Sequence, residues 1–457
     1  MKKNDIVTVE ITDLTSDGEG IGRAGTFPLF IKDTCVGDLA EVRVMKLKKT
    51  YGYARLLRIV RPSPDREAPL CPLARSCGGC QLQQMKYDAE LRFKANKVRQ
   101  NLKRIGGLEE EKQHFIFHEP LGMKEPWRYR NKAQVPFGTD KSGRIIAGFY
   151  AGHSHDIIDC EDCLLTFPEA ADCIRLVKEW MRRYRIRPYD ETNHTGLIRH
   201  VLVRKGFATG ELMVCVIING DRLPKAGLLA DQLKQLPGFR TLSVNMNQTT
   251  GNVILGDRTE TLYGPGYIED TIGGVRFRIS PESFYQVNPG QTQVLYGKAL
   301  EYAGLTGNET VWDLYCGIGT ISLFLAKAAK KVYGVEIVPR AIHDARENAA
   351  LNGLTNTEFF TGKAEEVLPA WHEAHPETRV DVIVVDPPRK GCDEACLETI
   401  LKMQPDRVVY VSCDSATLAR DLKYLTEGGY QVKEVQPVDQ FGKTVHVETV
   451  VLLSRNT

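Results

Sequence analysis

Acidic and sulfur-bearing side chains stand where short apolar runs end in the last third of the chain. Glu336 follows VYGV, Asp386 follows VDVIVV, and Cys413 and Asp414 follow RVVYVS. Residues at the carboxyl ends of parallel strands line the ligand crevice of an open α/β sheet. The pattern therefore predicts one site that combines carboxylates with a possible sulfur nucleophile.

A glycine-rich turn precedes these strand ends. The segment VWDLYCGIG, residues 311–319, is typical of a strand, a turn and a helix start, where Gly317 and Gly319 let the backbone approach a ligand. Glu336 lies 336 − 319 = 17 residues further on, close to the ~20 expected for an acid that binds ribose hydroxyls. The chain has neither G-x-G-x-x-G nor a Lys-Ser/Thr phosphate loop. We therefore expect a nucleoside cofactor without a pyrophosphate, S-adenosylmethionine rather than NAD.

Cys413 suggests one particular methylation. Carbon 5 of uracil is a poor nucleophile, but a thiolate that adds to carbon 6 makes carbon 5 enolate-like and able to attack a methyl sulfonium. A base must then remove the carbon-5 proton, and Glu448 at the start of the last strand, TVHVETVVLL, is the candidate. The alternatives without a catalytic role are an inert buried thiol at Cys413 and an exposed carboxylate at Glu448. Cys316 is a rival nucleophile, but its place in the cofactor turn favours a packing role.

A second group of cysteines points to a metal centre. Cys71, Cys77 and Cys80 have the spacing C-x5-C-x2-C with two glycines between the last pair, and Cys160 or Cys163 could supply a fourth thiolate. Four cysteines can hold a [4Fe–4S] cluster or zinc. The spacing is not that of a common zinc ribbon. We expect a structural cluster rather than small buried thiols or a redox centre.

The remaining sequence divides into three parts. Among 457 residues the net charge is +2, so a nucleic-acid surface would have to come from local clustering. Neither an apolar run of ~20 residues nor a signal peptide is evident, and we expect a cytoplasmic protein. The predicted parts are a small β-barrel at 1–60, a β-rich central region at 61–275 with a helix at 86–105, and an α/β unit at 276–457 with a Rossmann-like parallel sheet.

These motifs resemble the RNA uridine-C5 methyltransferases, and specifically their 23S ribosomal RNA branch. The resemblance covers nearly the whole chain, and together its motifs are very specific. Beside the cysteine spacing they are Phe284-Tyr-Gln-Val-Asn288, Asp313-Leu-Tyr-Cys-Gly-Ile-Gly319, Asp386-Pro-Pro-Arg-Lys-Gly391, Val411-Ser-Cys-Asp414, Thr417-Leu-Ala-Arg-Asp421 and His446-Val-Glu448.

The resemblance implies a role for each matching residue. Cys413 would be the nucleophile and Glu448 the base, while Asp386 would lie between cofactor and uracil. Phe284 would stack on RNA, and Cys163 rather than Cys160 would complete a [4Fe–4S] cluster. The cofactor contacts would be Gln286, Tyr315, Glu336 and Asp386. The N-terminal barrel resembles a TRAM domain, an RNA-binding module.

The resemblance also bears on the substrate. Its tRNA-specific bacterial members typically lack the barrel and the cluster, which favours 23S ribosomal RNA, with the target uridine flipped out of a loop. Two alternatives stay open: a tRNA uridine-C5 methyltransferase and a noncatalytic iron–sulfur RNA-binding protein. A base-amino methyltransferase is disfavoured because Arg389 replaces the aromatic residue that follows its prolines. The chain departs from the family at Ser415, where a proline is common, and this predicts a less rigid loop after the nucleophile.

Overall fold

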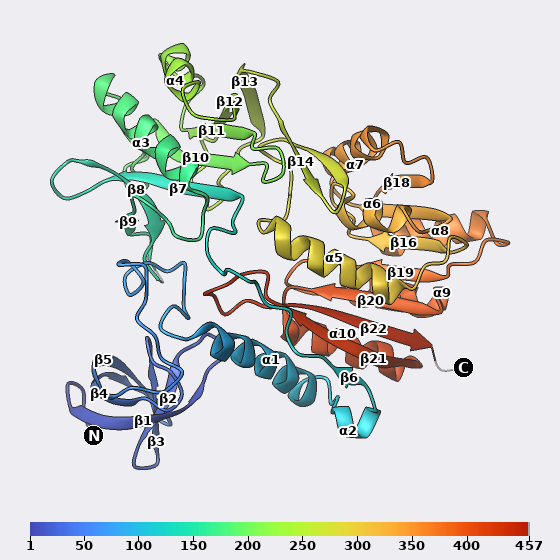
Figure 1. Ribbon diagram of the computed structural model, residues 1–457, viewed down its shortest axis with the longest axis horizontal. Helices are drawn as coiled ribbons and strands as arrows, with labels where there is room; N and C mark the ends of the chain where they lie inside the picture. Colours follow the sequence, from blue (N-terminus) through green and yellow to red (C-terminus); the bar gives the residue numbers. More distant parts are fainter. Residues whose placement is uncertain (153, 456–457) are drawn as a thin grey trace.

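The computed structural model describes residues 1–152 and 154–455, which form three parts, with one long helix running between the barrel and the α/β unit (Figure 1). The barrel and the central sheet both lie beside the α/β unit, which holds the C-terminal half of the chain. Within the described ranges, no helix combines the length and apolar character needed to cross a membrane.

The N-terminal part is a closed five-stranded barrel, as predicted. Its apolar residues alternate along each strand, so that one side of each strand fills the barrel interior, the period expected of a pleated strand. Closure in the order β1-β2-β3-β5-β4 leaves no exposed strand edge. The strands are β1 (Ile6–Leu14), β2 (Gly20–Ala24), β3 (Phe27–Ile31), β4 (Leu39–Leu47) and β5 (Gly52–Arg61).

The central part is a seven-stranded sheet whose order, β13-β12-β11-β10-β7-β8-β9, could not be derived from the sequence. Helices α3 and α4 cover one face through an apolar core, while the middle strands of the other face contribute to the core of the α/β unit. The elements are β7 (Lys132–Thr139), β8 (Ile145–Tyr150), β9 (Ile157–Asp159), α3 (Pro168–Arg183), β10 (Ile198–Lys205), β11 (Leu212–Ile218), α4 (Ala226–Leu233), β12 (Phe239–Met246) and β13 (Arg258–Tyr263).

The α/β unit confirms the predicted alternation of strands and helices. Its sheet has the order β18-β17-β16-β19-β20-β22-β21-β6, so the strand order reverses between β16 and β19, where open α/β sheets bind ligands. Its elements begin with the hairpin β14 (Ile268–Ile272) and β15 (Val275–Ile279). They continue with α5 (Pro289–Ala303), β16 (Thr310–Leu314), α6 (Thr320–Ala326), β17 (Lys331–Glu336), α7 (Pro339–Leu351), β18 (Thr357–Thr361), α8 (Ala364–Ala374), β19 (Val382–Val385), α9 (Glu394–Met403), β20 (Arg407–Ser412), α10 (Ser415–Glu427), β21 (Tyr430–Val438) and β22 (Glu448–Arg455).

One segment from the middle of the chain belongs spatially to this unit. Helix α1 (Tyr87–Arg104) packs on α10 and β21, and β6 (Ile116–Phe117) pairs in parallel with the edge strand β21. The short helix α2 (Glu110–Gln113) lies between them. Figure 1 shows α1 extending from the barrel along the α/β unit. This segment therefore precedes the central sheet in the sequence but packs against the C-terminal sheet.

Candidate active site

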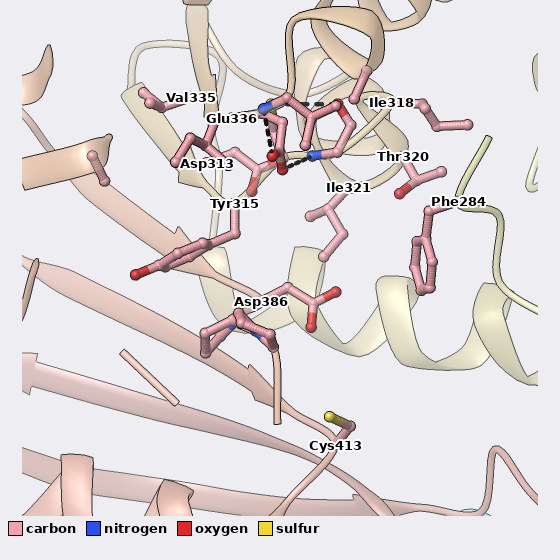
Figure 2. Close-up of a pocket in the computed structure, with 18 of the residues that line it drawn as sticks. Phe284, Asp313, Tyr315, Ile318, Thr320, Ile321, Val335, Glu336, Asp386 and Cys413 are labelled. Carbon is pink, nitrogen blue, oxygen red and sulfur yellow. Dashed lines mark hydrogen bonds between the residues drawn. The ribbon is translucent and has the colours of Figure 1, made fainter. Parts of the chain in front are cut away.

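A cavity of about 900 Å³ opens at the carboxyl ends of β16, β17, β19 and β20. It is lined by every residue that the sequence predicted for the cofactor, the catalytic step and RNA stacking. In Figure 2 Asp386 lies between the glycine-rich turn and Cys413. These lining residues are Phe284, Gln286, Tyr315, Glu336, Asp386, Cys413 and Glu448.

The glycine-rich turn is built by backbone contacts with the next strand. The N–H groups of Tyr315 and Cys316 both donate to the carbonyl of Val335, each at 3.0 Å. The tight reversal puts Gly317 at φ 55° and Gly319 at φ 82°, where glycine carries no steric cost. Tyr315 also adopts a positive φ of 71°, a strained conformation that is typical of ligand sites. Cys316 is buried and packs beneath the turn, as expected.

Two acids flank this turn in different environments. The Glu336 carboxylate accepts hydrogen bonds from the N–H of Gly317 at 3.3 Å and from that of Val338 at 3.0 Å, which fixes it at the rim of the cavity (Figure 2). Asp313, deeper in the cavity, accepts from the Ser322 hydroxyl, and burial raises its pKa to about 7. A fixed carboxylate beside a glycine-rich turn can bind ribose hydroxyls of a nucleoside.

The segment before α5 places Phe284 and Gln286 on the opposite wall. Arg204 donates to the Ser283 carbonyl at 2.5 Å, and Asn131 donates to the Gln286 carbonyl at 2.9 Å, so the central sheet holds this segment. The neighbours of Phe284 are buried, yet its own ring is 68% exposed. An exposed aromatic ring on a fixed backbone is suited to stacking on a nucleobase.

The catalytic candidates share one side of the cavity. Burial, with the Asp386 carboxylate adding to it, raises the pKa of Glu448 to about 8. Burial also raises the pKa of the Cys413 thiol to about 12, with Glu448 and Asp386 as further causes and the Arg389 guanidinium opposing them. The thiol is therefore neutral until charge changes around it. Burial likewise raises the pKa of Asp386 to about 7.

The loop that follows the nucleophile Cys413 is held by side-chain hydrogen bonds on both sides. The Asp414 carboxylate caps α10 by accepting from the N–H groups of Ala416 at 2.9 Å and Thr417 at 3.1 Å. The Ser415 hydroxyl accepts a hydrogen bond from the Asn101 side chain at 2.8 Å. A contact from a distant helix thus supports the loop at the position where proline is common in the family.

Helix α10 also holds the loop that follows Asp386. Thr417 donates to the Arg389 carbonyl at 3.1 Å, and Arg420 donates to the carbonyls of Lys390 and Cys392, each at 3.0 Å. Asp421 accepts from the Cys392 N–H at 2.8 Å. The segment Thr417–Asp421 therefore fixes the geometry between the strand ends of β19 and β20.

Arg389, Phe441 and His446 are among the lining residues that were not assigned a role from the sequence. Arg389 is the cation that lowers the pKa of both Cys413 and Glu448. Burial lowers the pKa of His446 to about 4, so its imidazole is neutral at physiological pH. The His446-Val-Glu448 spacing could have identified His446, since Phe441 and His446 precede the same strand.

The cysteines of the second motif come together from two segments. The Gly78 N–H donates to the Tyr150 carbonyl at 2.9 Å, which brings residues 71–80 beside the loops around β8 and β9. Burial raises the pKa of Cys80, Cys160 and Cys163, and nearby thiols among Cys71, Cys77, Cys80, Cys160 and Cys163 raise several of these values further. The five thiols are therefore near enough to influence one another electrostatically, and none of them lines the cavity.

The thiols are not packed as tightly as the ligands of a single ion. Thiolates around one zinc ion lie about 3.8 Å apart when the Zn–S bonds are ~2.3 Å. Within residues 1–152 and 154–455, the only potential ligands that place three donor atoms within 4.8 Å of one another are His343, Asp344 and Glu347. In the described part of the chain, no three cysteine sulfurs therefore lie as close together as the ligands of one zinc ion.

Comparison with known proteins agrees with this geometry. Residues 267–456 match the model of the tRNA (Uracil-5-)-methyltransferase family, and residues 2–57 match the TRAM domain. The chain is 53% identical over 454 residues to an RNA methyltransferase of Halalkalibacterium halodurans, covering 99% of this chain and 98% of the relative. It is 51% identical to one of Listeria innocua, covering 99% and 98%.

A solved structure extends the match to the whole architecture. The tRNA (uracil-54, C5)-methyltransferase of Pyrococcus abyssi, in complex with S-adenosyl-L-homocysteine, has a TM-score of 0.76 and 27% identity and covers 98% of this chain and 100% of its own. The fold and site define an S-adenosylmethionine-dependent RNA methyltransferase. The chain belongs to the RNA uracil-5-methyltransferase family, in a form with an N-terminal TRAM domain.

Proposed function

We propose that this enzyme methylates carbon 5 of a uridine in 23S ribosomal RNA, with Cys413 as the nucleophile and Glu448 as the base. The observation that carries the proposal is that these two side chains face one cavity together with Asp386 and the glycine-rich turn. A sulfur nucleophile and a base with a pKa of about 8 are the two groups that C5 methylation needs.

The charges of the cavity fit S-adenosylmethionine. Asp313, Glu336 and Asp386 surround the space beside the turn, and a cofactor with a sulfonium and an ammonium group would be attracted to them. The bound cofactor supplies an electrophilic methyl group. Glu336 would hold the ribose, Gln286 and Tyr315 would line the cofactor, and Asp386 would separate it from the uracil.

The target base would enter on the side of Cys413. The Cys413 thiol would give its proton to solvent water, and the resulting thiolate would bond to carbon 6 of the uracil, which leaves electron density on carbon 5 and the neighbouring carbonyl oxygen. Arg389 is the nearby cation that can stabilise the thiolate and this charge. After methylation, Glu448 would take the proton from carbon 5, and the carbon–sulfur bond would break to release Cys413.

RNA would contact more than the cavity. Phe284 is placed to stack on a base that has been flipped out of its loop. On the barrel, the rings of Phe30, Tyr51 and Tyr53 pack together with centroids 5.3–5.8 Å apart, beside the lysines of the β4–β5 turn. Aromatic rings with lysines are suited to single-stranded RNA. The Arg128 guanidinium forms an ion pair with Asp162 at 2.6 Å.

The cysteine group fits a [4Fe–4S] cluster by donor type. We propose Cys71, Cys77, Cys80 and Cys163 as its ligands, with Cys163 more deeply buried than Cys160. The cluster would cross-link the segment before α1 to the loop after β9. Anaerobic purification should give a brown protein with about four irons per chain, whereas zinc alone would contradict the assignment.

A tRNA uridine-C5 methyltransferase is the second candidate, because the Pyrococcus abyssi enzyme matches this chain over its full length, barrel included. Transfer of labelled methyl groups to 23S ribosomal RNA fragments and to tRNA transcripts separates the two. Methylation of tRNA alone would overturn the ribosomal substrate. No transfer to any RNA by the intact holoenzyme would favour a noncatalytic RNA-binding protein.

A further inference from the structure

Helix α1 presents a row of polar side chains to the loops that carry the catalytic candidates. Glu90, Lys94, Lys97 and Asn101 stand at positions i, i+4, i+7 and i+11, which lie on one face of a helix. The helix precedes the family match at 267–456 by more than a hundred residues. Glu90 and Lys94 in its polar row are nevertheless fully buried, and Lys97 and Asn101 are half-buried.

The C-terminal end of this row contacts the nucleophile loop. Asn101 donates to the Ser415 hydroxyl at 2.8 Å, and Ser415 is buried, begins α10 and lies two residues after Cys413. Asp414 accepts from two N–H groups of α10 on its other side. The backbone that carries Cys413 is thus fixed from α10 and from α1.

The middle of the row contacts the loop that leads to the base. Lys97 donates to the Val445 carbonyl at 3.0 Å, three residues before Glu448. The same ammonium group donates to the Ser16 carbonyl of the barrel at 3.1 Å. Lys97 therefore joins the barrel and the 439–446 loop through one side chain.

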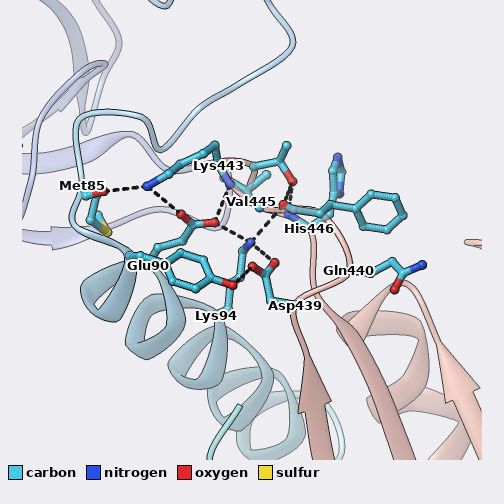
Figure 3. A network of polar contacts seen from close by, with 12 residues as sticks. Met85, Glu90, Lys94, Asp439, Gln440, Lys443, Val445 and His446 are labelled. Carbon is cyan, nitrogen blue, oxygen red and sulfur yellow. Dashed lines mark hydrogen bonds and ion pairs between the residues drawn. The ribbon is translucent and has the colours of Figure 1, made fainter. Parts of the chain in front are cut away.

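The N-terminal part of the row is a buried ionic network (Figure 3). Lys94 donates to Glu90 at 2.7 Å, to Asp439 at 2.5 Å and to the Phe441 carbonyl at 3.1 Å. Glu90 in turn accepts from the Lys443 N–H at 2.7 Å. Burying such charges gives little net stability, and the best-attested benefit is a defined geometry.

We propose that α1 is a positioning element for both catalytic side chains, with Asn101 acting on Cys413 through Ser415 and Lys97 acting on Glu448 through Val445. The inference rests on the proposed function of Cys413 and Glu448. No residue of the row lines the cavity, so the helix acts only through the loops that it holds.

The two contacts should serve different steps. A nucleophile must reach carbon 6 within about 3–3.5 Å, and a displacement of ~1 Å can cost ~100-fold in rate. Loss of the Asn101 contact should slow formation of the Cys413 adduct. Loss of the Lys97 contact should slow its breakdown, because the base is displaced while the thiol is not. A merely structural helix would affect both steps alike.

The experiment uses the full-length holoenzyme with Asn101→Ala and Lys97→Met. Asn96→Ala and Lys103→Met are the matched controls, since both residues are exposed on the same helix. Adduct formation is followed with RNA that carries 5-fluorouridine, and adduct breakdown with ordinary RNA. We expect about a tenfold slower formation for Asn101→Ala and adduct accumulation for Lys97→Met, with unchanged cofactor affinity. Equal rates in each variant and its control would overturn the proposal.

A rescue separates positioning from loss of folding. Asp414 has the extended conformation that precedes proline, with φ −138° and ψ 108°, and Ser415 is the first residue of α10, where proline is favoured. Ser415→Pro should restore the adduct rate of Asn101→Ala by stiffening the same loop. If Asn101→Ala does not fold, Ser415→Ala removes the same contact from the other partner. No rescue in a well-folded double variant would count against the inference.

One measurement does not depend on the RNA chemistry. The rate at which iodoacetamide alkylates Cys413, mapped by mass spectrometry, should differ between Asn101→Ala and Asn96→Ala. A wild-type enzyme that forms no adduct with RNA would defeat the proposed function. The alkylation rates would still test the α1 contact, and equal rates would refute it.

Discussion

The two halves of the cavity are built in different ways. The cofactor half consists of β16, the glycine-rich turn, α6 and β17, and its contacts join residues about twenty positions apart, as between Gly317 and Glu336. The target half is held by contacts between residues hundreds of positions apart, such as Asn101 with Ser415 and Lys94 with Asp439. The first half is a local supersecondary unit, whereas the second exists only in the assembled molecule.

This difference predicts that the two halves can be damaged separately. Variants in the target half should lose chemistry and keep cofactor binding. Variants in the cofactor half should bind the cofactor more weakly and keep the rate of the chemical step at saturating cofactor. A variant of either half that abolished both properties in a folded protein would break the comparison.

Replacing the nucleophile should have the largest effect. Cys413→Ala removes the thiol that forms the bond to carbon 6, so methyl transfer should fall by about 10³-fold or more. Binding of S-adenosyl-L-homocysteine, measured by calorimetry, should stay within about twofold because the cofactor acids are untouched. Methylation at the wild-type rate would remove Cys413 as the nucleophile.

Replacing the base should come next. Glu448→Gln keeps the shape but cannot take the carbon-5 proton, so turnover should fall roughly 100- to 10,000-fold. Unlike Cys413→Ala, this variant should accumulate a covalent adduct with ordinary RNA after methylation, visible as a shifted band on a denaturing gel. Full turnover without an adduct would show that another group removes the proton.

A smaller effect is expected in the cofactor half. Glu336→Gln keeps the side-chain shape, but its single amide oxygen can accept from only one of the two backbone N–H groups, and it loses the charged hydrogen bonds to a ribose. Cofactor affinity should therefore fall by about tenfold. The single-turnover rate at saturating cofactor should be unchanged. A lower saturated rate with normal affinity would contradict the division between the two halves.

The smallest effect is expected for the pH dependence of cofactor binding. Burial raises the pKa of Asp386 to about 7, so its carboxyl is neutral at pH 5.5 and mostly ionised at pH 7.5. The ionised form attracts the positive cofactor, and affinity should therefore rise several-fold with pH across this range. Asp386→Asn should make the profile shallower, with Asp313, whose pKa burial also raises to about 7, as the remaining acid. Comparison with the wild type cancels titration of the cofactor itself. An equally steep profile in that variant would exclude Asp386 as the cause.

Many residues of the site could be predicted from short stretches of the sequence. Strand ends rich in acids predicted Glu336 and Asp386, and the alternation of strands and helices predicted the sheet that places them together. The Cys-x5-Cys-x2-Cys motif predicted a metal centre, which stays a prediction, and the structure brings Cys80 near enough to Cys163 for the two thiols to influence each other electrostatically. Local patterns succeed here because a βα unit fixes the position of its own strand end.

Other features had no local signal. The order of the central sheet depends on pairings such as β10 with β7, which are set by packing between distant strands. The nucleophile loop was expected to be less rigid because only Ser415 was considered, and its partner Asn101 lies 314 residues earlier. His446 and Arg389 lie in the same cavity because the tertiary structure brings the loop before β22 and the segment after β19 together.

The sequence by itself determined the chemical groups: a thiol, a base, carboxylates for a cationic cofactor, and a glycine-rich turn to admit it. These follow from residue type and short spacing, which the backbone of one βα unit translates directly into position. Only the tertiary structure decided which groups share a cavity, how burial raises the pKa of Cys413 and Glu448, and which helix holds them. Burial and contacts between distant segments arise from the packing of the whole chain, which no single stretch of sequence encodes.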